Sequence, residues 1–301
     1  MHERYQTASN AVNRTDLPAG GGIARMPHHH REGPLTSDTA VQHIARYRFE
    51  GADRWGRREG DVFVRLDAPP WLGGHESGPR DAAARAVLLP PAEPTKIVCV
   101  GLNYRDHIAE SATAVPGGLD APAAPLLFLK PPSAVVATGE AIRYPRGVER
   151  LDPEAELGVI IGRRARAVSL ESALDHVAGY TCFNDVSARN YQRKDGQWTR
   201  AKGFDTFAPL GPWVAVGLAP GALDVRCRVN GEQRQHGNTA DLLHTVPALI
   251  RFISHIMTLE PGDVIATGTP AGVGPVVPGD IVEIEVQGVG VLVNRIEAAT
   301  T

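Results

Sequence analysis

Residues 151–192, LDPEAELGVIIGRRARAVSLESALDHVAGYTCFNDVSARNYQ, carry most of what the chain says about its fold. Glu154 and Glu156 stand two apart at the head of an apolar run, and residues i and i+2 of a β-strand point to the same face. A second apolar run, 177–183, returns a neighbouring strand alongside the first, and Asp185 follows it. The stretch therefore predicts adjacent strands with three carboxylates gathered near one edge.

Three carboxylates in an apolar setting repel one another and lose solvation, so they need protons or a cation. A hard divalent cation is the simplest answer, because oxygen-only ligation suits Mg²⁺, Mn²⁺ or Ca²⁺, whereas zinc usually adds Cys or His. The alternative is that Glu154 and Glu156 lie on a solvated strand face, the commoner situation for an isolated Glu-x-Glu pair. The run GVIIG at 158–162 indicates a buried strand and favours the metal site.

The composition excludes several classes of protein. The chain has 301 residues, is 43% hydrophobic and carries a formal charge of -3, so it has material for a large core and no basic field for nucleic acid. No run approaches the roughly 18 apolar residues of a membrane span, and the N-terminus lacks an apolar signal-peptide region. Its three cysteines, Cys99, Cys182 and Cys227, are far apart in apolar segments. We expect a cytoplasmic protein with reduced core cysteines and no membrane partner.

The sequence divides into three parts. Residues 1–40 are polar and rich in Gly, Pro and His, which predicts a flexible N-terminal extension. Residues 41–94 alternate as strands of a small β-rich domain do, with a turn-like segment at 51–61, and end in a proline-rich step. Residues 95–301 form the expected main domain.

The main domain opens with a short apolar strand and a helical turn that carries His107 and Glu110. Their i,i+3 spacing places imidazole and carboxylate on one helix face, where the carboxylate orients the ring and raises its basicity. This arrangement prepares a general base, although an ordinary surface helix explains the pair equally well. Lys130 ends a later apolar run. Its ammonium group either faces a site or extends to the solvent while its methylene chain covers apolar surface.

Polar residues after Asp185 extend the candidate site. Arg189 and Gln192 are i,i+3 neighbours if Ser187 caps a short helix, and together they suit a substrate carboxylate. Lys202 follows Trp198, a setting in which a lysine either has a lowered pKa or stabilises a developing oxyanion. An unremarkable basic surface loop is the alternative.

The C-terminal third is mostly scaffold. Asn230-Gly231 predicts a tight hairpin, and Asn238 or Thr239 is expected to cap an amphipathic helix over 239–258. Short strands broken by glycine-proline turns follow. The glycine-rich loop 267–274 brings backbone N–H groups near an anionic ligand, but such a loop alone is weak evidence.

Five segments in this order resemble the fumarylacetoacetate hydrolase family: GLNYRDHIAE, DPEAELGVIIG, GYTCFNDVSARNYQ, WTRAKGFDTFAPLGP and MTLEPGDVIATGTPAGVGP. The match covers roughly residues 96–296. The resemblance implies an α+β, β-rich fold, a mixed β-roll or β-sandwich with flanking helices, preceded by the small β-rich N-terminal domain that many members carry. It also implies a homodimer.

The resemblance assigns roles to nine residues. It implies Mg²⁺ or Mn²⁺, with Ca²⁺ in some members, on Glu154, Glu156 and Asp185, and substrate contacts from Arg189, Gln192, Lys202 and Thr269. His107 and Glu110 match the dyad of members that activate water. Asn190 departs from the pattern, since many members have Asp after the arginine.

The implied activity is metal-dependent hydrolysis of a C–C bond in an acylpyruvate, a small-molecule 2-oxo acid. His107, oriented by Glu110, would draw a proton from water, and Lys202 would stabilise the departing enolate. The alternatives within the fold are oxaloacetate decarboxylation and isomerisation or decarboxylation of 2-hydroxyhepta-2,4-diene-1,7-dioate. A non-catalytic metal-binding relative is a remote alternative.

Overall fold

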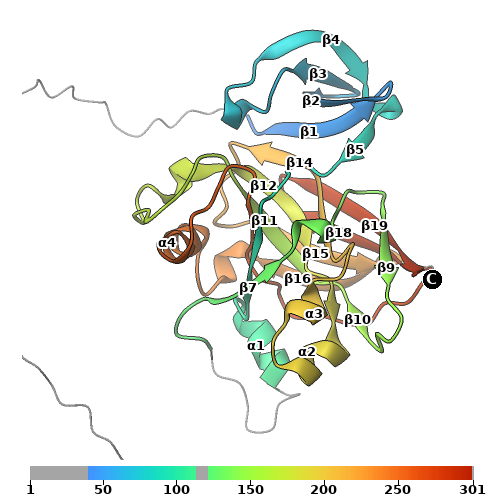
Figure 1. Cartoon of the computed structure of the whole chain (residues 1–301), viewed down its shortest axis with the longest axis vertical. Coiled ribbons are helices and arrows are strands. Elements are labelled where there is room, and N and C mark those ends of the chain that lie inside the picture. Colours follow the sequence, from blue (N-terminus) through green and yellow to red (C-terminus); the bar gives the residue numbers. More distant parts are fainter. Residues whose placement is uncertain (1–39, 113–120, 300–301) are drawn as a thin grey trace, which may run out of the picture. The chain divides into compact units, whose positions relative to one another are not determined.

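The computed structural model describes residues 40–112 and 121–299. Twelve strands within these ranges form one large sheet, and β1 (Gln42–Phe49) joins the N-terminal strands to the rest by pairing with β14 (Ala208–Val216) (Figure 1). The expected extension over residues 1–40 lies outside the described residues, apart from its last position.

The strand order of the large sheet runs outward in both directions from its neighbouring strands β1 and β14. On one side of β1 and β14 lie β2 (Ala52–Glu59), β3 (Val62–Leu66) and β4 (Glu76–Ala82). On the other side lie β12 (Val177–Asn184), β11 (Ala155–Ile161), β17 (Val264–Ala266), β6 (Ile97–Gly101) and β7 (Leu126–Lys130). β5 (Val87–Leu89) pairs with β1, and β8 (Val135–Val136) pairs with β14.

A second sheet of five strands has the order β16 (Glu232–Asn238), β15 (Asp224–Val229), β18 (Ile281–Val286), β19 (Gly290–Ala298) and β9 (Ala141–Tyr144). A small pair consists of β10 (Leu151–Asp152) and β13 (Ser187–Ala188). The α-helices are α1 (Arg105–Ala112), α2 (Arg189–Asp195), α3 (Thr199–Lys202) and α4 (Val246–Ile256). Short 3₁₀ helices are η1 (Pro70–Leu72), η2 (Ala83–Arg85), η3 (Pro132–Ala134), η4 (Ala173–His176) and η5 (Thr239–Asp241).

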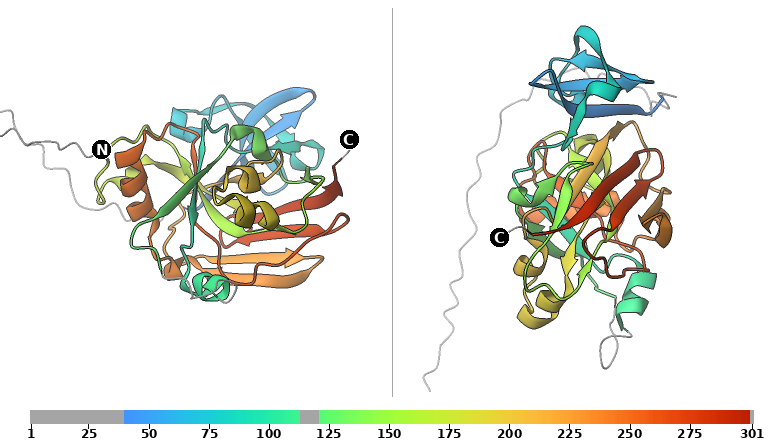
Figure 2. Two further views of the ribbon diagram at one scale, coloured as in Figure 1. Left: turned by 60° about the horizontal axis from the view of Figure 1, so that its bottom comes forward. Right: turned by 90° about the vertical axis from the view of Figure 1, so that its right-hand side faces the viewer.

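The core lies between the two sheets, where β18 and β19 pack against β12 and β14 (Figure 2). Every residue of β11 is buried, because both of its faces are covered. Leu157, Val159 and Ile161 point into the main core, whereas Ile160 packs into a second cluster with Phe183. A strand buried on both faces has a continuous apolar sequence, which explains the run that follows the Glu-x-Glu pair. The expected β-rich fold is confirmed.

The register of β11 and β12 brings the carboxylates together. The two strands are antiparallel, with Ala155 opposite Asn184 and Glu156 opposite Phe183. The start of β11 therefore lies beside the end of β12. The amide N–H of Asp185 donates to the carbonyl of Glu154 at 3.0 Å, and Glu154 N donates to the Asn184 side chain at 3.0 Å. The predicted adjacent strands are confirmed.

Two expectations about local structure are wrong. The turn-like segment 51–61 contains β2, whose charged side chains pair with charges on other strands of the sheet, as Arg54 does with Asp81 of β4 at 2.9 Å. The C-terminal helix begins at Val246, with Thr245 at its N-cap. Pro247 lacks an N–H and is tolerated only in a first turn, so the helix cannot run through it from residue 239.

Two other local predictions, the tight hairpin and the reduced core cysteines, are confirmed. Asn230 and Gly231 both have positive φ and join β15 to β16, as a tight hairpin turn requires. Cys99, Cys182 and Cys227 are free and buried. No helix in the described part of the chain is long and apolar enough to cross a membrane.

Candidate active site

A cavity of about 440 Å³ opens where α1, α2 and α3 meet the start of β11. Figure 1 shows these three helices at one end of the strands. The cavity wall contains every residue that the sequence singled out for the site: His107, Glu110, Glu154, Glu156, Asp185, Arg189, Gln192, Lys202 and Thr269. Residues far apart in the sequence therefore meet in one space.

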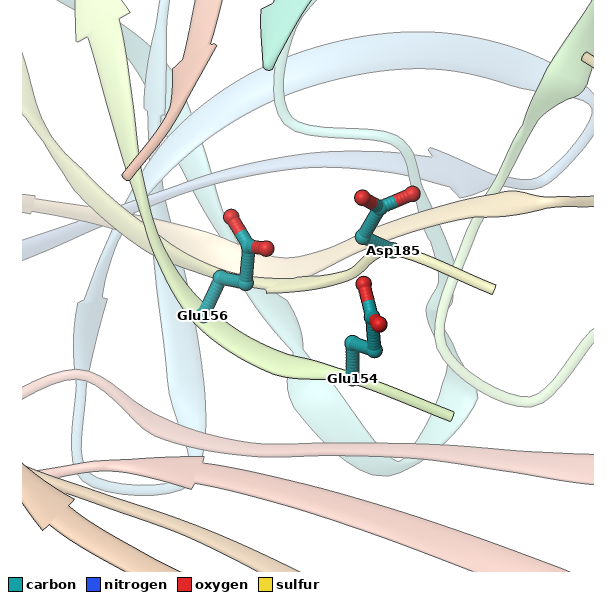
Figure 3. A group of neighbouring side chains, drawn as sticks. All are labelled: Glu154, Glu156 and Asp185. Carbon is teal, nitrogen blue, oxygen red and sulfur yellow. The ribbon is translucent and has the colours of Figure 1, made fainter. Parts of the chain in front are cut away.

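The three acidic residues lie at the buried end of this cavity. Glu154, Glu156 and Asp185 are at most 4% exposed, and one carboxylate oxygen from each lies within 4.8 Å of the others. Their side chains converge from the start of β11 and from the segment that follows β12 (Figure 3). The alternative of a solvated strand face is wrong, because β11 is covered on both sides.

Lys202 bridges two of these carboxylates. Its Nζ donates to Glu154 Oε2 and to Asp185 Oδ2, both at 2.7 Å, and lies 5.0 Å from the centre of the Phe128 ring. Burial alone would lower the pKa of Lys202, but the charges of Asp185 and Glu154 raise it above its usual value. The lowered pKa considered for this lysine is therefore wrong, and Lys202 is a fixed cation.

Lys130 pairs with one of these carboxylates, that of Asp185. It is 1% exposed, and its Nζ lies 2.7 Å from Asp185 Oδ1. Its three protons go to the carbonyls of Val186, Lys202 and Phe207, at 3.0, 2.7 and 2.7 Å. Of its two interpretations, the solvent-facing one is wrong.

The pKa values of Glu154 and Glu156 are shifted in opposite directions. Burial, together with the charges of Asp185 and Glu154, raises the pKa of Glu156 well above its usual value. Burial acts in the same direction on Glu154, but the charges of Arg189 and Lys202 outweigh it and hold the pKa of that carboxyl below its usual value. Glu156 is thus the member whose charge is least compensated by the protein.

The donor set fits a hard divalent cation. The cluster offers only carboxylate oxygens, the ligands that Mg²⁺, Mn²⁺ and Ca²⁺ prefer. Asp185 Oδ1 is buried and lies 2.7 Å from the Lys130 ammonium, but it accepts no hydrogen bond from any described residue, because the protons of Lys130 are directed to carbonyls. Among the described residues, Glu156 forms no salt bridge and accepts one hydrogen bond, from Gly268 N at 2.8 Å. These free acceptor positions are what a bound cation requires.

The glycine-rich loop 267–274 holds the Glu156 carboxylate through the N–H of Gly268. Gly268 has φ of +102°, and a Cβ built there would lie 2.8 Å from the Cβ of Asn103. The position therefore requires glycine for two reasons, the positive φ and the close approach. Thr269 holds the loop to β11, because its hydroxyl donates to Ala155 O at 2.9 Å.

His107 and Glu110 face each other on α1. His107 Nδ1 lies 3.5 Å from Glu110 Oε2, and the histidine is 8% exposed. The Glu110 carboxylate accepts from Gly272 N at 3.1 and 3.2 Å, so it connects α1 to the glycine loop. The predicted juxtaposition is present, at a separation slightly longer than a good hydrogen bond.

Arg189 was expected to contact the substrate, but its N–H groups already donate to three side chains of the protein. Its guanidinium donates to Asp152 at 2.8 Å, to Gln192 Oε1 at 2.9 Å and to Glu154 Oε1 at 2.5 Å. It therefore neutralises two buried carboxylates and fixes the amide of Gln192. Ser187 does not cap the following helix, since it lies in β13 and its hydroxyl donates to Asp185 O.

A model described as fumarylacetoacetate (FAA) hydrolase C-terminal matches residues 96–297, and one described as Rv2993c-like, N-terminal matches residues 42–91. The chain belongs to the fumarylacetoacetate hydrolase family. Oxaloacetate tautomerase fahd2, mitochondrial, of Xenopus laevis is 42% identical over 223 residues, which cover 70% of this chain and 68% of that protein.

Two solved structures of the family are similar over 86% of this chain and the whole of their own chains. A 2-hydroxyhepta-2,4-diene-1,7-dioate isomerase from Mycobacterium marinum has 38% identity and a TM-score of 0.79. A maleylpyruvate hydrolase from Sphingobium sp. SYK-6, solved with manganese(II) and pyruvate, has 30% identity and a TM-score of 0.69.

Asn190, the departure from the family's pattern, faces away from the carboxylates. Its amide donates to Gly147 O at 3.0 Å and accepts from Glu149 N at 3.3 Å. An ionised aspartate has no donor for that carbonyl, so asparagine suits this contact better.

Sequence reasoning did not single out Asp152 and Gln235. Asp152 is fully buried between Arg150 and Arg189. Gln235 is buried and joins Ala155 N, Thr269 Oγ1 and Pro270 O. Asp152 adjoins the Glu-x-Glu motif and was in principle detectable, whereas nothing in the sequence around Gln235 indicates its role.

Proposed function

We propose that this family member is a divalent-metal-dependent enzyme that hydrolyses the C–C bond of an acylpyruvate. The observation that carries the proposal is the meeting, in one cavity, of three buried carboxylates, the protonated Lys202 and the His107–Glu110 pair. The maleylpyruvate hydrolase relative, solved with manganese(II) and pyruvate, supports this assignment.

Glu154, Glu156 and Asp185 would hold the metal through their oxygens. When bound, a divalent cation supplies Lewis acidity, which polarises the carbonyl of a 2-oxo acid and stabilises the corresponding enolate. Lys202 contributes a fixed positive charge beside the same oxygens, because its raised pKa keeps it protonated.

His107 acts as the general base in this reaction. It takes a proton from a water molecule that attacks the distal carbonyl of the acylpyruvate, while Glu110 orients the imidazole. The bond between that carbonyl carbon and C3 then breaks, and its electron pair goes to C3. One acylpyruvate and one water thus give a carboxylic acid and, after protonation of C3, pyruvate.

Isomerisation of a 2-oxo diacid is the second candidate. The relatives named as an oxaloacetate tautomerase and a 2-hydroxyhepta-2,4-diene-1,7-dioate isomerase share 42% and 38% identity with this chain, more than the hydrolase relative does. This chemistry, and oxaloacetate decarboxylation, needs the same enolate but no attacking water.

The deciding assay follows the ultraviolet enol absorption of acetylpyruvate and of oxaloacetate with Mn²⁺ or Mg²⁺ and then with EDTA. Faster metal-dependent loss of acetylpyruvate, with pyruvate and acetate as products, supports the hydrolase. Preferred turnover of oxaloacetate favours the second candidate. Inertness towards both substrates contradicts the proposal and points to isomerisation of a dienoate or to a non-catalytic relative.

A histidine variant tests the general base. His107→Ala is expected to lower acetylpyruvate hydrolysis at least 100-fold while Mn²⁺ binding, measured by calorimetry, stays unchanged. His255→Ala is the matched control, since His255 is exposed on α4 and lies outside the cavity wall. Full activity in His107→Ala would rule out the water-activating role.

The homodimer remains a proposal that rests on the family resemblance, and the cytoplasmic location remains one that rests on the composition of the sequence. Light scattering coupled to size-exclusion chromatography tests the assembly, with twice the chain mass of 32.2 kDa expected.

A further inference from the structure

The cavity wall contains three arginines, Arg150, Arg189 and Arg193, and two of them are already paired. Arg189 donates to Asp152, Gln192 and Glu154, as described above. Arg150 donates to both oxygens of Asp152, at 2.8 and 2.9 Å. No hydrogen bond or ion pair links Arg193 to any part of the chain that the structure describes. Its guanidinium is therefore the arginine of the wall that is free to meet an anion from solution.

The place of Arg193 on α2 relates it to the carboxylate cluster. It lies four residues after Arg189, so the two side chains leave the same face of the helix, about 6 Å apart along its axis. Arg189 Nη2 is 2.5 Å from Glu154 Oε1. Arg193 thus stands one helical turn away from the proposed metal ligands, and it is exposed at the cavity mouth.

The wall includes apolar side chains as well. It contains Val100, Leu102, Phe128, Trp198 and Val273. Phe128 and Trp198 pack edge to face with ring centres 5.2 Å apart. Trp198 also covers Gly101 so closely that a Cβ there would lie 2.7 Å from the indole ring. Such a surface suits a short hydrocarbon chain.

We propose that Arg193 binds the distal carboxylate of a dicarboxylic substrate, so that the preferred substrates are acylpyruvates that end in a second carboxylate. This inference rests on the proposed function for the position of the 2-oxo acid end at Glu154, Glu156 and Asp185. A chain of about four carbons beyond the 2-oxo acid matches the helical turn between Arg189 and Arg193. The planar guanidinium can receive the carboxylate through two parallel hydrogen bonds.

The test compares 2,4-dioxoheptanedioate with 2,4-dioxoheptanoate, which differ only in the terminal carboxylate. The native enzyme is expected to prefer the diacid. Arg193→Gln should lower kcat/KM for the diacid about 10- to 100-fold and change that for the monoacid less than threefold. Lys194→Gln is the matched control, because it removes the same charge from the next residue of α2, outside the cavity wall.

Three kinetic outcomes would overturn the inference. An equal loss on both substrates would mean that Arg193 contacts the carboxylate they share, and no loss on either would mean that it contacts neither. A preference of the native enzyme for the monoacid would also contradict it.

Binding of unreactive analogues separates this inference from the proposed function. 2-Oxoheptanedioate and 2-oxoheptanoate lack the 4-oxo group and cannot undergo the hydrolysis, and their affinities for the Mn²⁺-loaded protein are measured by calorimetry. If neither dioxo acid is turned over but Arg193→Gln weakens binding of the diacid alone, the proposed function fails and the binding of a distal carboxylate by Arg193 stands. If hydrolysis is found but both analogues lose affinity equally, the inference fails and the proposed function stands.

Discussion

Replacement of Lys130 by methionine should destabilise the protein strongly, because this residue connects four segments beneath the candidate site. Its ammonium is fully buried, 2.7 Å from Asp185 Oδ1, and donates to three carbonyls. Burial lowers the pKa of Lys130, but three acceptors need three N–H donors, which only the protonated form has. Methionine has a similar length and removes the charge and all three donors.

The expected loss follows from these contacts. Removing one partner of a buried ion pair costs about 3–5 kcal/mol, since the remaining charge stays buried. Each carbonyl left without a donor would add about 1–3 kcal/mol if the site did not relax. Lys202 still donates to the other oxygen of Asp185 and limits the damage. We therefore expect a loss of about 4 kcal/mol, or about 10 °C in Tm for a chain of this size.

Thermal unfolding of Lys130→Met in the presence of EDTA measures this loss without a contribution from metal. Lys96→Met is the matched control, because Lys96 also pairs with a buried carboxylate, that of Asp263. Asp263 keeps hydrogen bonds from Thr95 and Glu260, so the control should lose only about 1 kcal/mol. Equal Tm values for the two variants would refute the reasoning from the Lys130 contacts.

Three further predictions concern metal, loop and acid stability. Mn²⁺ should raise the Tm and EDTA should reverse the change, because a cation relieves repulsion among buried carboxylates; an unchanged Tm would argue against the metal site. Gly268→Ala should weaken Mn²⁺ binding in calorimetry, because a Cβ near Asn103 displaces the N–H that holds Glu156; unchanged affinity would show that the loop adapts. A hydrogen bond from Arg65 lowers the pKa of Asp81 to about 2, so this buried carboxylate stabilises the fold above its ordinary pKa of 3.8. About 1–2 kcal/mol should be lost as the pH falls from 4 to 2, after allowance for solvent screening, and Asp81→Asn should lack this loss in acid unfolding.

The carboxylate cluster was predictable because short-range rules place it. Glu154 and Glu156 share a face because side chains of a strand alternate with a period of two residues. The second apolar run forms a strand alongside the first, and this places Asp185 beside them. Lys130 was ambiguous for the opposite reason. Its partners come from residues 186, 202 and 207, more than 50 positions away, and no local pattern encodes such contacts.

The β2 strand illustrates a second limit of sequence reasoning. Its glycine and five charged residues are typical of a turn, and strand propensity is low for them. The strand forms because other strands provide opposite charges, as Arg48 of the neighbouring β1 does for Asp53 at 2.7 Å. Cross-strand partners decide the outcome, and they are known only once the pairing is known.

The arginines of the cavity show that residue type alone does not decide whether a side chain is available to bind a ligand. The sequence indicated Arg189 as a substrate contact, yet its donors are taken by Asp152, Glu154 and Gln192. Arg193 has the same chemistry and no such partners within residues 40–112 and 121–299. Only the three-dimensional structure distinguishes a cation that balances buried charge from one that can bind a ligand.

The proposed metal ligands and Arg193 belong to different parts of the structure, so substitutions at the two places differ in their effect on stability. The proposed metal ligands belong to β11 and the segment after β12, which are buried in the core, so changes there also affect stability. Arg193 is an exposed residue of a short helix, and substitutions of exposed residues usually alter stability by less than about 0.5 kcal/mol. Substrate preference can therefore shift through α2 while the metal chemistry stays intact, which fits a family whose members resemble this chain closely yet carry the names of a tautomerase, an isomerase and a hydrolase.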